Sequence, residues 1–454
     1  MKSLKILLFI LISCISSYGQ FNMPSFKEVA TTFFSKYSFD SYESYLKFQR
    51  KKDGWYVSED NYNNPGNYFN TKLFLSKVDN NYRDLEYKST NGDTTFLSET
   101  VGKYLTQINW TYEEYQYQRN KYYGYPGWDW DIINDVTKQT NITDSLLESQ
   151  ARAYFNYASG FIAEQFGDLF VNNDTDRLPI KASDKISKSR IEKFIFYELK
   201  AINAYTEILK LNSEYITRVG NIKIKLANEY MFSFLELLMA GDTIKAKEFA
   251  VKAEYPDSLL SLSKSYLSKL PLNSILITSG DNDTYPLWYL QKVKNFRTDI
   301  SVLNYNLIGF RRYLSLINQE QKPRLFSTID TIYLKDNFDY FLYRNQSDKS
   351  TQIDVKTFLI HLEKDYNPHD TSYTLYKGEK LKKYYSKNLF FELNEKEKSK
   401  PIQIGDYLFM NDYILLDIIT TSNKRKVYFT YNIDLLSPLL TQRGNVYELT
   451  YNDK

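Results

Sequence analysis

Cysteine and histidine are almost missing from this sequence of 454 residues, which has one cysteine and two histidines. The cysteine, Cys14, lies in a segment that has the character of a leader. Zinc sites built from cysteine and histidine are therefore excluded, as are a cysteine nucleophile and a disulfide after that leader. A Ser-His-Asp triad would need His361 or His369, and both lie in a polar stretch without a nucleophile elbow.

The sequence also lacks a marked excess of either charge. It has 58 Lys and Arg against 55 Asp and Glu, a formal net charge of +3. A nucleic-acid-binding face needs a basic excess, so no nucleic-acid partner is expected. After the leader no apolar run reaches the ~18 residues that span a bilayer, so we expect no transmembrane segment in the mature chain.

The first residues predict export. Met1–Gln20 has a basic start, an apolar run and small residues before Gln20, which is the pattern of a signal peptide over residues 1–19. Cleavage before Gln20 would release a soluble periplasmic protein, and this route is favoured. The segment Leu11–Cys14 also resembles a lipobox, which would make the protein a membrane-anchored lipoprotein through Cys14. Neither route indicates an oligomeric state.

Residues 20–140 predict a mixed region with antiparallel strands. Two strand-like runs, Tyr45–Phe48 and Gly54–Val57, flank a turn and predict a hairpin. Tyr122–Asp131 is dense in Tyr and Trp and is broken by Gly and Pro, so a loop is expected. The loop could stack on a carbohydrate, but an ordered loop between two domains is the favoured interpretation.

Residues 141–271 predict a helical region. Ala and aromatic residues recur at helix spacing, as in Ala151–Phe161 and Ala201–Asn212. Small residues next to aromatic ones allow helices to pack closely, and the pattern loosely resembles tetratricopeptide helix pairs. A plain helical bundle is the alternative. A solenoid would offer a concave surface to a protein partner.

Residues 272–454 alternate strand-like and helical runs, which indicates an α/β domain. Ile275–Thr278 predicts a buried strand, Pro286–Val293 a helix with one buried face, and Ile300–Leu303 a returning strand. A unit of about 30 residues has the size of one βαβ crossover, so the two strands should be parallel. Asp283 or Thr284 is expected to cap the helix.

The loop after the first of these strands holds the most informative segment, Asp281-Asn282-Asp283. An apolar strand followed by Asp-x-Asp is typical of the metal site of sugar-nucleotide glycosyltransferases, in which two carboxylates hold Mg²⁺ or Mn²⁺. A structural Ca²⁺ ion is a further alternative, and helix capping is favoured over all of these. No catalytic residue is assigned. The candidate binding residues are Asp281, Asn282, Asp283, Thr284, Trp288 and Arg425, with Asp281 and Asp283 as the candidate metal ligands.

Two stretches carry a family resemblance. Gly280–Gln291, which reads GDNDTYPLWYLQ, and the later stretch from Asn411 to Leu449 resemble the soluble C-terminal part of bacterial multi-pass membrane proteins related to protein O-mannosyltransferases. The resemblance covers about residues 266–452, and Lys426 stands where the family usually has proline. The catalytic machinery of that family is expected in a membrane half that this sequence lacks, so no catalytic residue is carried over.

The sequence therefore predicts a multidomain α+β protein with an N-terminal β-containing region, a central helical region and a C-terminal α/β domain. The favoured function is an exported cell-envelope scaffold or binding protein, accessory to envelope glycosylation or secretion, with an envelope protein or a glycan as its partner. The alternative is a divalent-metal-dependent enzyme that acts on sugars or sugar phosphates through Asp281 and Asp283.

Overall fold

The structure is a computed structural model, and its described residues fall into two compact units. The units are Met1–Tyr157 with Phe166–Thr175, and Ala158–Gln165 with Asp176–Lys454. The predicted leader and His369 lie outside the described residues. The residues described are 44–51, 54–61, 70–73, 128–162, 177, 180, 184–217, 219–320, 325, 340–343, 352–364, 374–375, 379–380, 382–384, 386–394, 397–422 and 425–451.

The first unit contains the predicted hairpin. Strands β1 (Ser44–Lys51) and β2 (Gly54–Asn61) pair antiparallel with Lys51 opposite Gly54, and β3 (Asn70–Leu73) adds to the β2 edge. The hairpin prediction is confirmed, because the pairing places a two-residue connection where the turn was expected.

The aromatic segment Tyr122–Asp131 was expected to be a loop throughout, and this is wrong for its last four residues. Residues 122–127 lie outside the described part of the chain, but helix α5 (Trp128–Thr137) begins directly after Gly127. The Trp130 ring lies 4.8 Å from the ring of Tyr157 in α6 (Asp144–Ser159). Proline and glycine end before Trp128, so nothing in the following residues opposes a helix.

The second unit begins with the predicted helices. They are α7 (Lys188–Leu211), α8 (Ile222–Met239), α9 (Thr243–Ala250) and α10 (Asp257–Lys269), with the short strands β4 (Ile216–Thr217) and β5 (Gly220–Asn221) between α7 and α8. Capping defines several starts: the Ser187 side chain accepts from the Arg190 backbone N–H, and Asp242 accepts from that of Lys245. Among the described residues no helix is both long and apolar enough to cross a membrane.

A five-stranded sheet forms the core of the α/β part. It has the order β19-β20-β18-β6-β7, and β6 (Ile275–Thr278) runs parallel to both β7 (Ser301–Asn304) and β18 (Val427–Phe429). Helix α11 (Asp281–Lys292) connects β6 to β7, so the predicted βαβ unit and its parallel pairing are confirmed. Strands β19 (Leu440–Arg443) and β20 (Val446–Leu449) extend the sheet antiparallel, after the 3-10 helix η3 (Asp434–Leu439).

Further helices and short strands complete this unit. Two helices, α12 (Arg311–Glu320) and α14 (Met410–Thr421), precede and follow a region of small strands that also contains α13 (Val355–Lys364). The strands are β8 (Tyr340–Tyr343), β9 (Ile353–Asp354), β10 (Thr374–Leu375), β11 (Glu379–Lys380), β12 (Lys382–Tyr384), β13 (Asn388–Phe390), β14 (Glu392–Asn394), β15 (Glu397–Lys398), β16 (Ile402–Gln403) and β17 (Tyr407–Phe409).

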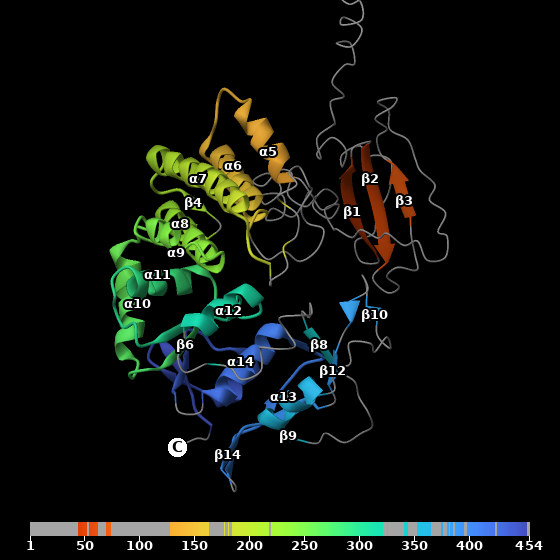
Figure 1. Ribbon diagram of the computed structural model, residues 1–454, viewed down its shortest axis with the longest axis vertical. Helices are drawn as coiled ribbons and strands as arrows, with labels where there is room; N and C mark the ends of the chain where they lie inside the picture. The colour runs from red at the N-terminus through yellow and green to blue at the C-terminus, as the bar shows by residue number, and fades with distance from the viewer. Residues whose placement is uncertain are drawn as a thin grey trace, which may run out of the picture. The chain divides into compact units, whose positions relative to one another are not determined.

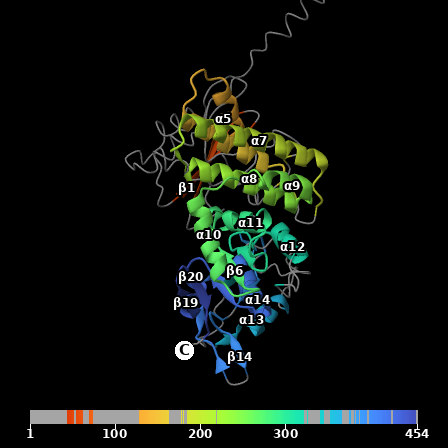
Figure 2. The ribbon, with the colours of Figure 1, turned by 90° about the vertical axis from the view of Figure 1, so that its left-hand side faces the viewer.

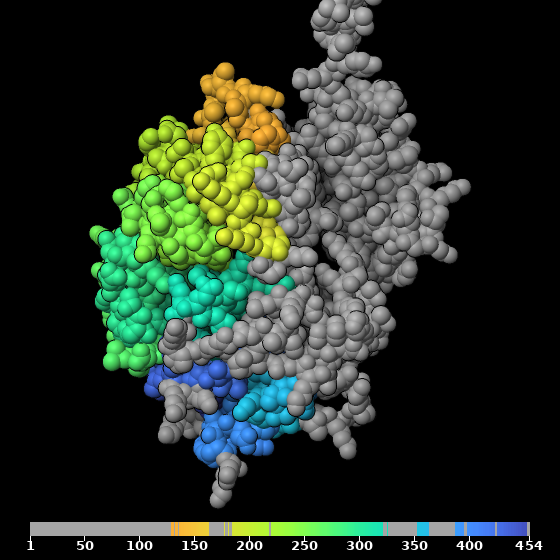
Figure 3. Space-filling model, in the orientation of Figure 1, coloured from red at the N-terminus to blue at the C-terminus, as the bar shows by residue number. Residues whose placement is uncertain are grey.

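The helices from α7 to α11 form a layered stack against the sheet region. Helices α8 and α9 lie beside α10 and α11 in both ribbon views (Figures 1 and 2). The space-filling view shows an unbroken packed surface from the yellow-green of α7 to the green of α10 and the teal of α12 (Figure 3). The predicted α+β class is confirmed, and the second unit joins the helices to the sheet in one compact body.

Candidate functional site

The candidate site lies at the carboxyl end of β6, where α11 begins. Gly280 precedes the first turn of α11 with a φ of 79°, a conformation that glycine adopts without a steric cost. No side chain caps the helix at Gly280, so the prediction that Asp283 or Thr284 does so is wrong. The helix begins at Asp281, at least three residues earlier than the capping prediction requires. Both residues are therefore part of its first turn.

Thr284 points into the core at this end of the sheet. It is fully buried, and its hydroxyl lies 2.7 Å from that of Thr278 at the end of β6. It also donates to the Gly280 carbonyl at 2.8 Å and accepts from the Asn304 side-chain amide at 2.8 Å. One hydroxyl thus connects the ends of the parallel strands β6 and β7, so Thr284 stabilises the fold at this point.

Asp283 bonds to the neighbouring strand. The hydroxyl of Thr430, which follows β18, donates to the Asp283 carboxylate at 2.5 Å. The backbone N–H of Thr430 donates to the Ile277 carbonyl at 3.0 Å and continues the parallel ladder. Asp283 therefore fastens the residue after β18 to the start of α11.

Asn282 faces the helical layer. Its side-chain oxygen accepts from the Asn228 amide on α8 at 2.8 Å, and its own amide donates to the Val219 carbonyl at 2.6 Å. Asn228 in turn accepts from the hydroxyl of Tyr255 at 2.9 Å. Asn282 thus joins the sheet region to the helices through two amide groups.

Asp281 lies on the same side as Asn282 and keeps contact with solvent. Partial desolvation raises the pKa of its carboxyl, while the ammonium of Lys225 and a hydrogen bond from Tyr285 act in the opposite direction. Asp281 is thus oriented towards α8 and away from the edge where Asp283 meets Thr430.

The positions of Asp281 and Asp283 bear on the predicted metal site. Residues i and i+2 of a helix point in different directions, and these two carboxylates have different partners. Among the residues that the structure describes, no three or more Cys, His, Asp or Glu side chains gather where a metal ion could be held. The geometry does not bring the two predicted ligands together, and metal binding at Asp281 and Asp283 stays a prediction.

Trp288 belongs to the core. Its indole N–H donates to the Val302 carbonyl of β7 at 3.2 Å, and its ring lies between those of Tyr285 and Tyr313, with centroids 5.7 and 6.0 Å away. It is 6 % exposed and lines a small cavity of about 100 Å³, so its role in binding stays a prediction.

Arg425, which the sequence groups with the Asp281–Asp283 loop as a candidate binding residue, lies away from that loop. Its guanidinium donates to the carbonyls of Asn273 and Ser274 at 2.6 and 3.1 Å, and to the Ser301 hydroxyl at 2.7 Å. These residues lie at the amino ends of β6 and β7. The length of β6 therefore separates Arg425 from Asp281, because the chain between them is an extended strand.

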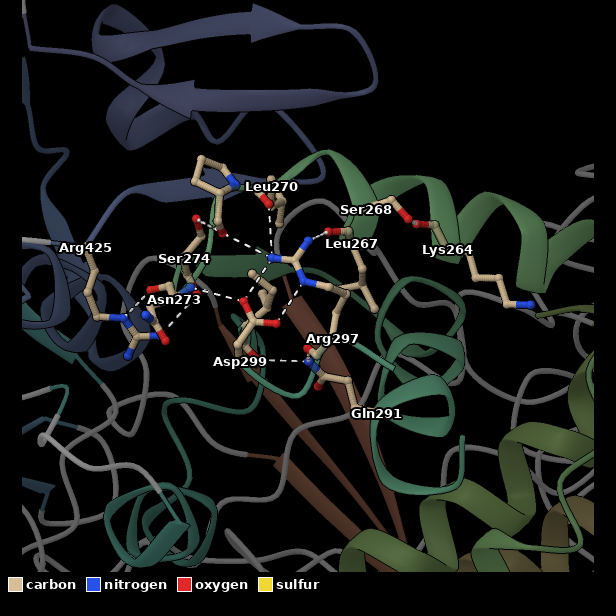
Figure 4. Close-up of polar contacts among 12 residues, drawn as sticks. Lys264, Leu267, Ser268, Leu270, Asn273, Ser274, Gln291, Arg297, Asp299 and Arg425 are labelled. Carbon is tan, nitrogen blue, oxygen red and sulfur yellow. Dashed lines mark hydrogen bonds and ion pairs between the residues drawn. The ribbon is translucent and has the colours of Figure 1, made fainter. Parts of the chain in front are cut away.

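A second arginine holds the same amino edge (Figure 4). Arg297 pairs with Asp299 at 2.8 Å and donates to the carbonyls of Leu267 and Leu270 at the end of α10, at 2.5 and 3.0 Å. The hydrogen bond from Arg297 lowers the pKa of Asp299 to about 2. Arg297 and Asp299 lie within residues 266–452, which the family resemblance covers, and they connect α10 to the sheet.

A buried charged cluster next to Asn282 was missed by the sequence reasoning. Glu198 of α7 and Glu229 of α8 are 0 % and 2 % exposed. Lys225 pairs with Glu229, and Ser233 donates to Glu198 at 3.3 Å. Burial, and then the charge of Glu229, raise the pKa of Glu198 well above its usual range. The available signal was Lys225 and Glu229, four residues apart on a helix rich in apolar residues.

Partly exposed polar groups follow the ends of β7 and β18. Tyr305 donates its hydroxyl to Asp412 in the first turn of α14, and its ring meets that of Tyr431 edge-on at 6.4 Å. The Asn306 amide donates to the Ser279 hydroxyl at 3.3 Å. Strands β7 and β18 flank β6 on opposite sides, and the carboxyl end of such an arrangement is where open α/β sheets bind ligands.

Comparison with known families agrees with the resemblance at a coarse level. Residues 259–450 match the family model described as TMEM260-associated domain 2, a C-terminal domain of TMEM260-like, O-mannosyltransferase-like proteins. The match begins in α10 and extends through β20, so it includes both edges of the sheet but not α7, α8 or α9. No curated protein and no solved structure matches the chain. The tetratricopeptide resemblance stays a prediction.

Proposed function

We propose that this chain is an exported cell-envelope binding protein that acts as an accessory scaffold in envelope glycosylation or secretion. Its partner is an envelope protein or a glycan. One observation carries the proposal. The side chains of Asn282, Asp283 and Thr284 each form a hydrogen bond to a different element of the same unit. Side chains used in this way make a rigid platform, and they do not converge on one reacting atom, as catalysis requires.

The partly exposed surface at the carboxyl ends of β6, β7 and β18 is the proposed binding face. It offers the two tyrosine rings Tyr305 and Tyr431 beside the polar groups of Ser279 and Asn306. Tyrosine combines a broad apolar face with a polar hydroxyl, which suits recognition of a sugar or of a protein surface. The family match supports a link to glycosylation, because the matched domain occurs in O-mannosyltransferase-like proteins.

The test captures the partner in its native setting. Tagged protein is cross-linked in envelopes of its native host, purified, and its partners are identified by mass spectrometry. We expect to recover one stoichiometric envelope protein or glycoconjugate. Asn306→Ala in the proposed binding face should reduce the amount recovered, and Gln442→Ala on the distant strand β19 should leave it unchanged. Equal recovery with both variants would show that the partner does not bind at this face.

The enzymatic alternative is tested separately with the purified protein. Sugar nucleotides and lipid-linked sugars are supplied as donors with Mg²⁺ or Mn²⁺, and sugar transfer or hydrolysis is measured. The proposal expects no turnover above a heat-inactivated control. Metal-dependent turnover that both Asp281→Asn and Asp283→Asn abolish would overturn the scaffold and establish the enzyme.

A further inference from the structure

A cavity of about 650 Å³ opens between α13, β14 and α14, and it shares no lining residue with the proposed binding face. This volume is within the range of sites for small organic ligands and single peptide side chains. Tyr451 also lines the cavity, with its ring 5.4 Å from that of Phe391. Nothing in the proposed function uses this cavity.

The lining of the cavity combines apolar and charged side chains. Leu359 and Ile419 are apolar and almost fully buried. The lining also includes three carboxylates and one ammonium group, those of Asp354, Glu392, Asp417 and Lys356. This balance disfavours phosphates, sugar nucleotides and acidic peptides, because like charges repel in a partly desolvated site.

The hydroxyl groups of the lining face the cavity as acceptors. Thr420 donates its proton to the Leu416 carbonyl at 2.7 Å, and Thr421 donates its proton to the Asp417 carboxylate at 3.1 Å. Both protons are used within α14, so the oxygen lone pairs remain for a ligand. The Thr420 oxygen is an acceptor apart from the carboxylates, and it also indicates a ligand that donates hydrogen bonds.

One carboxylate is held in place by backbone groups. Asp354 accepts from the backbone N–H of Thr357 at 3.0 Å and from that of Glu392 at 3.2 Å. Asp417 is 1 % exposed and lies on the buried face of α14. The acceptors are therefore fixed by the fold, while Glu392 and Lys356 are exposed at the rim.

We infer that this cavity binds an aliphatic cation, an alkylammonium or guanidinium group on an apolar stem. The acceptor groups of the lining receive the charged head, and its apolar side chains cover the stem, as for a lysine or arginine side chain. The Tyr451 ring adds a face that attracts cations. The source is either a basic segment of a partner protein or a free polyamine.

The experiment measures binding by isothermal titration calorimetry with the full chain. The probes are an acetylated, amidated Ala-Lys-Ala peptide, its norleucine counterpart, spermidine, inorganic phosphate and a methyl glucoside. We expect the lysine peptide or spermidine to bind, the norleucine peptide to bind at least ten-fold more weakly, and phosphate not to bind. Binding should also weaken as salt rises, because the rim charges are exposed.

Substitutions at the rim keep the test independent of folding. Glu392→Gln should weaken cation binding about two- to five-fold, and Lys356→Ala should strengthen it by a similar factor. Glu207→Gln, the same charge change on the exposed face of α7, should leave affinity unchanged. Asp417→Asn should abolish binding, and circular dichroism would report whether that buried variant still folds.

The outcomes separate the sources and can overturn the inference. A lysine peptide that binds more tightly than spermidine identifies a basic protein segment, and the reverse order identifies a free polyamine. Equal binding of the norleucine and lysine peptides would overturn the inference, as would preferred binding of the glucoside or no binding of any cation.

Discussion

The two ends of the parallel strands β18, β6 and β7 are held by opposite chemistry. At the amino end, Arg297 donates to backbone carbonyls at the end of α10, and Arg425 donates to the two backbone carbonyls just before β6. At the carboxyl end, Asp283 and Thr284 meet a hydroxyl and an amide around the start of α11. A helix end offers carbonyl acceptors and a helix start offers N–H donors, so cations suit the first end and acids the second.

Side chains of one βαβ unit thus build junctions at both ends of its strands. Arg297 and Asp299 follow the Gly280–Gln291 stretch in the sequence, yet they lie at the other end of the strands. They connect the unit to α10, while Asn282 connects it to α8. The proposed function uses the surface next to these junctions, at the proposed binding face.

The largest expected effect comes from breaking the amino end with Arg297→Ala. The change removes the ion pair to Asp299 and leaves the carbonyls of Leu267 and Leu270 without their donor. Leaving such acceptors unpaired is costly, so the free energy of unfolding should fall by about 2–4 kcal/mol. Urea unfolding at pH 7 measures this loss.

Arg297→Lys sharpens the same test. Lysine keeps the charge but cannot reach several carbonyls in a fork, so it should recover less than half of the loss. Arg443→Ala is the matched control, because its pair with Glu448 at 3.4 Å lies on an exposed strand and should cost less than about 1 kcal/mol. Equal losses at Arg297 and Arg443 would contradict the assigned role.

The carboxyl end should be weakened less by Thr284→Val. Valine keeps the shape of threonine but removes the hydroxyl that accepts from Asn304 and contacts Thr278. The loss of this buried network should cost about 1–2 kcal/mol, measured by urea unfolding. Thr206→Val, whose hydroxyl only donates to the Ile202 carbonyl in its own helix, should change stability by less than about 0.5 kcal/mol.

The pH dependence should separate the amino end from the buried cluster beside Asn282. The pKa of Asp299 is lowered to about 2, so its contribution is present above about pH 4 and is lost as the pH falls towards 2. The pKa of Glu198 is raised by burial and by Glu229, so its contribution is full below about pH 4.5 and is lost as the pH rises through its folded pKa.

Unfolding curves from pH 2.5 to 8 test this contrast with two substitutions. Asp299→Asn should flatten the profile below pH 4 and leave it unchanged above. Glu198→Gln should flatten it above pH 4.5, because the amide has no proton to lose near Glu229 and Lys225. A Glu198→Gln profile identical to that of the native protein would show that Glu198 does not titrate in this range.

The smallest expected effect is that of divalent metal on the carboxyl end. Because Asp281 and Asp283 have different partners, Mg²⁺, Mn²⁺ or Ca²⁺ at 1 mM should shift the melting temperature by less than about 1 °C, since only exposed charges are screened. A larger shift that Asp283→Asn removes would instead establish the metal site. Asp257→Asn, on the exposed start of α10, is the control for non-specific binding.

Much of the fold could be predicted from local patterns. The hairpin, the central helices and the βαβ unit at Ile275–Leu303 follow from hydrophobic period and turn residues, which act over a few neighbours. The loop expected up to Asp131 was wrong at its end, because glycine and proline mark a break but do not show how soon a helix follows. The capping prediction failed for a related reason. The helix begins directly after Gly280 without a side-chain cap, so Asp281 and Asp283 interact with other residues.

The candidate site was located from the sequence, but its bonds were not. Asp281, Asn282 and Asp283 are consecutive, yet one faces Lys225, one Asn228 and one Thr430, which lie on α8 and after β18. The sequence groups Arg425 with the loop that follows β6, but the side chain lies at the residues that precede β6. A basic turn before a strand does not show which strand lies beside it. The cluster of Glu198 and Glu229 joins two helices 31 positions apart in the sequence, so neither residue alone indicates a pair.

The sequence by itself determined the elements of this protein, the parallel unit and the stretch that matches a known family. These depend on contacts between near neighbours along the chain, and each leaves a periodic or spaced pattern. Only the tertiary structure decided that the motif side chains serve as junctions and that two arginines hold the opposite edge of the sheet. It also decided that a cavity with acidic side chains in its lining lies between α13 and α14. Those features arise from pairs far apart in the chain, whose meeting depends on how whole elements pack.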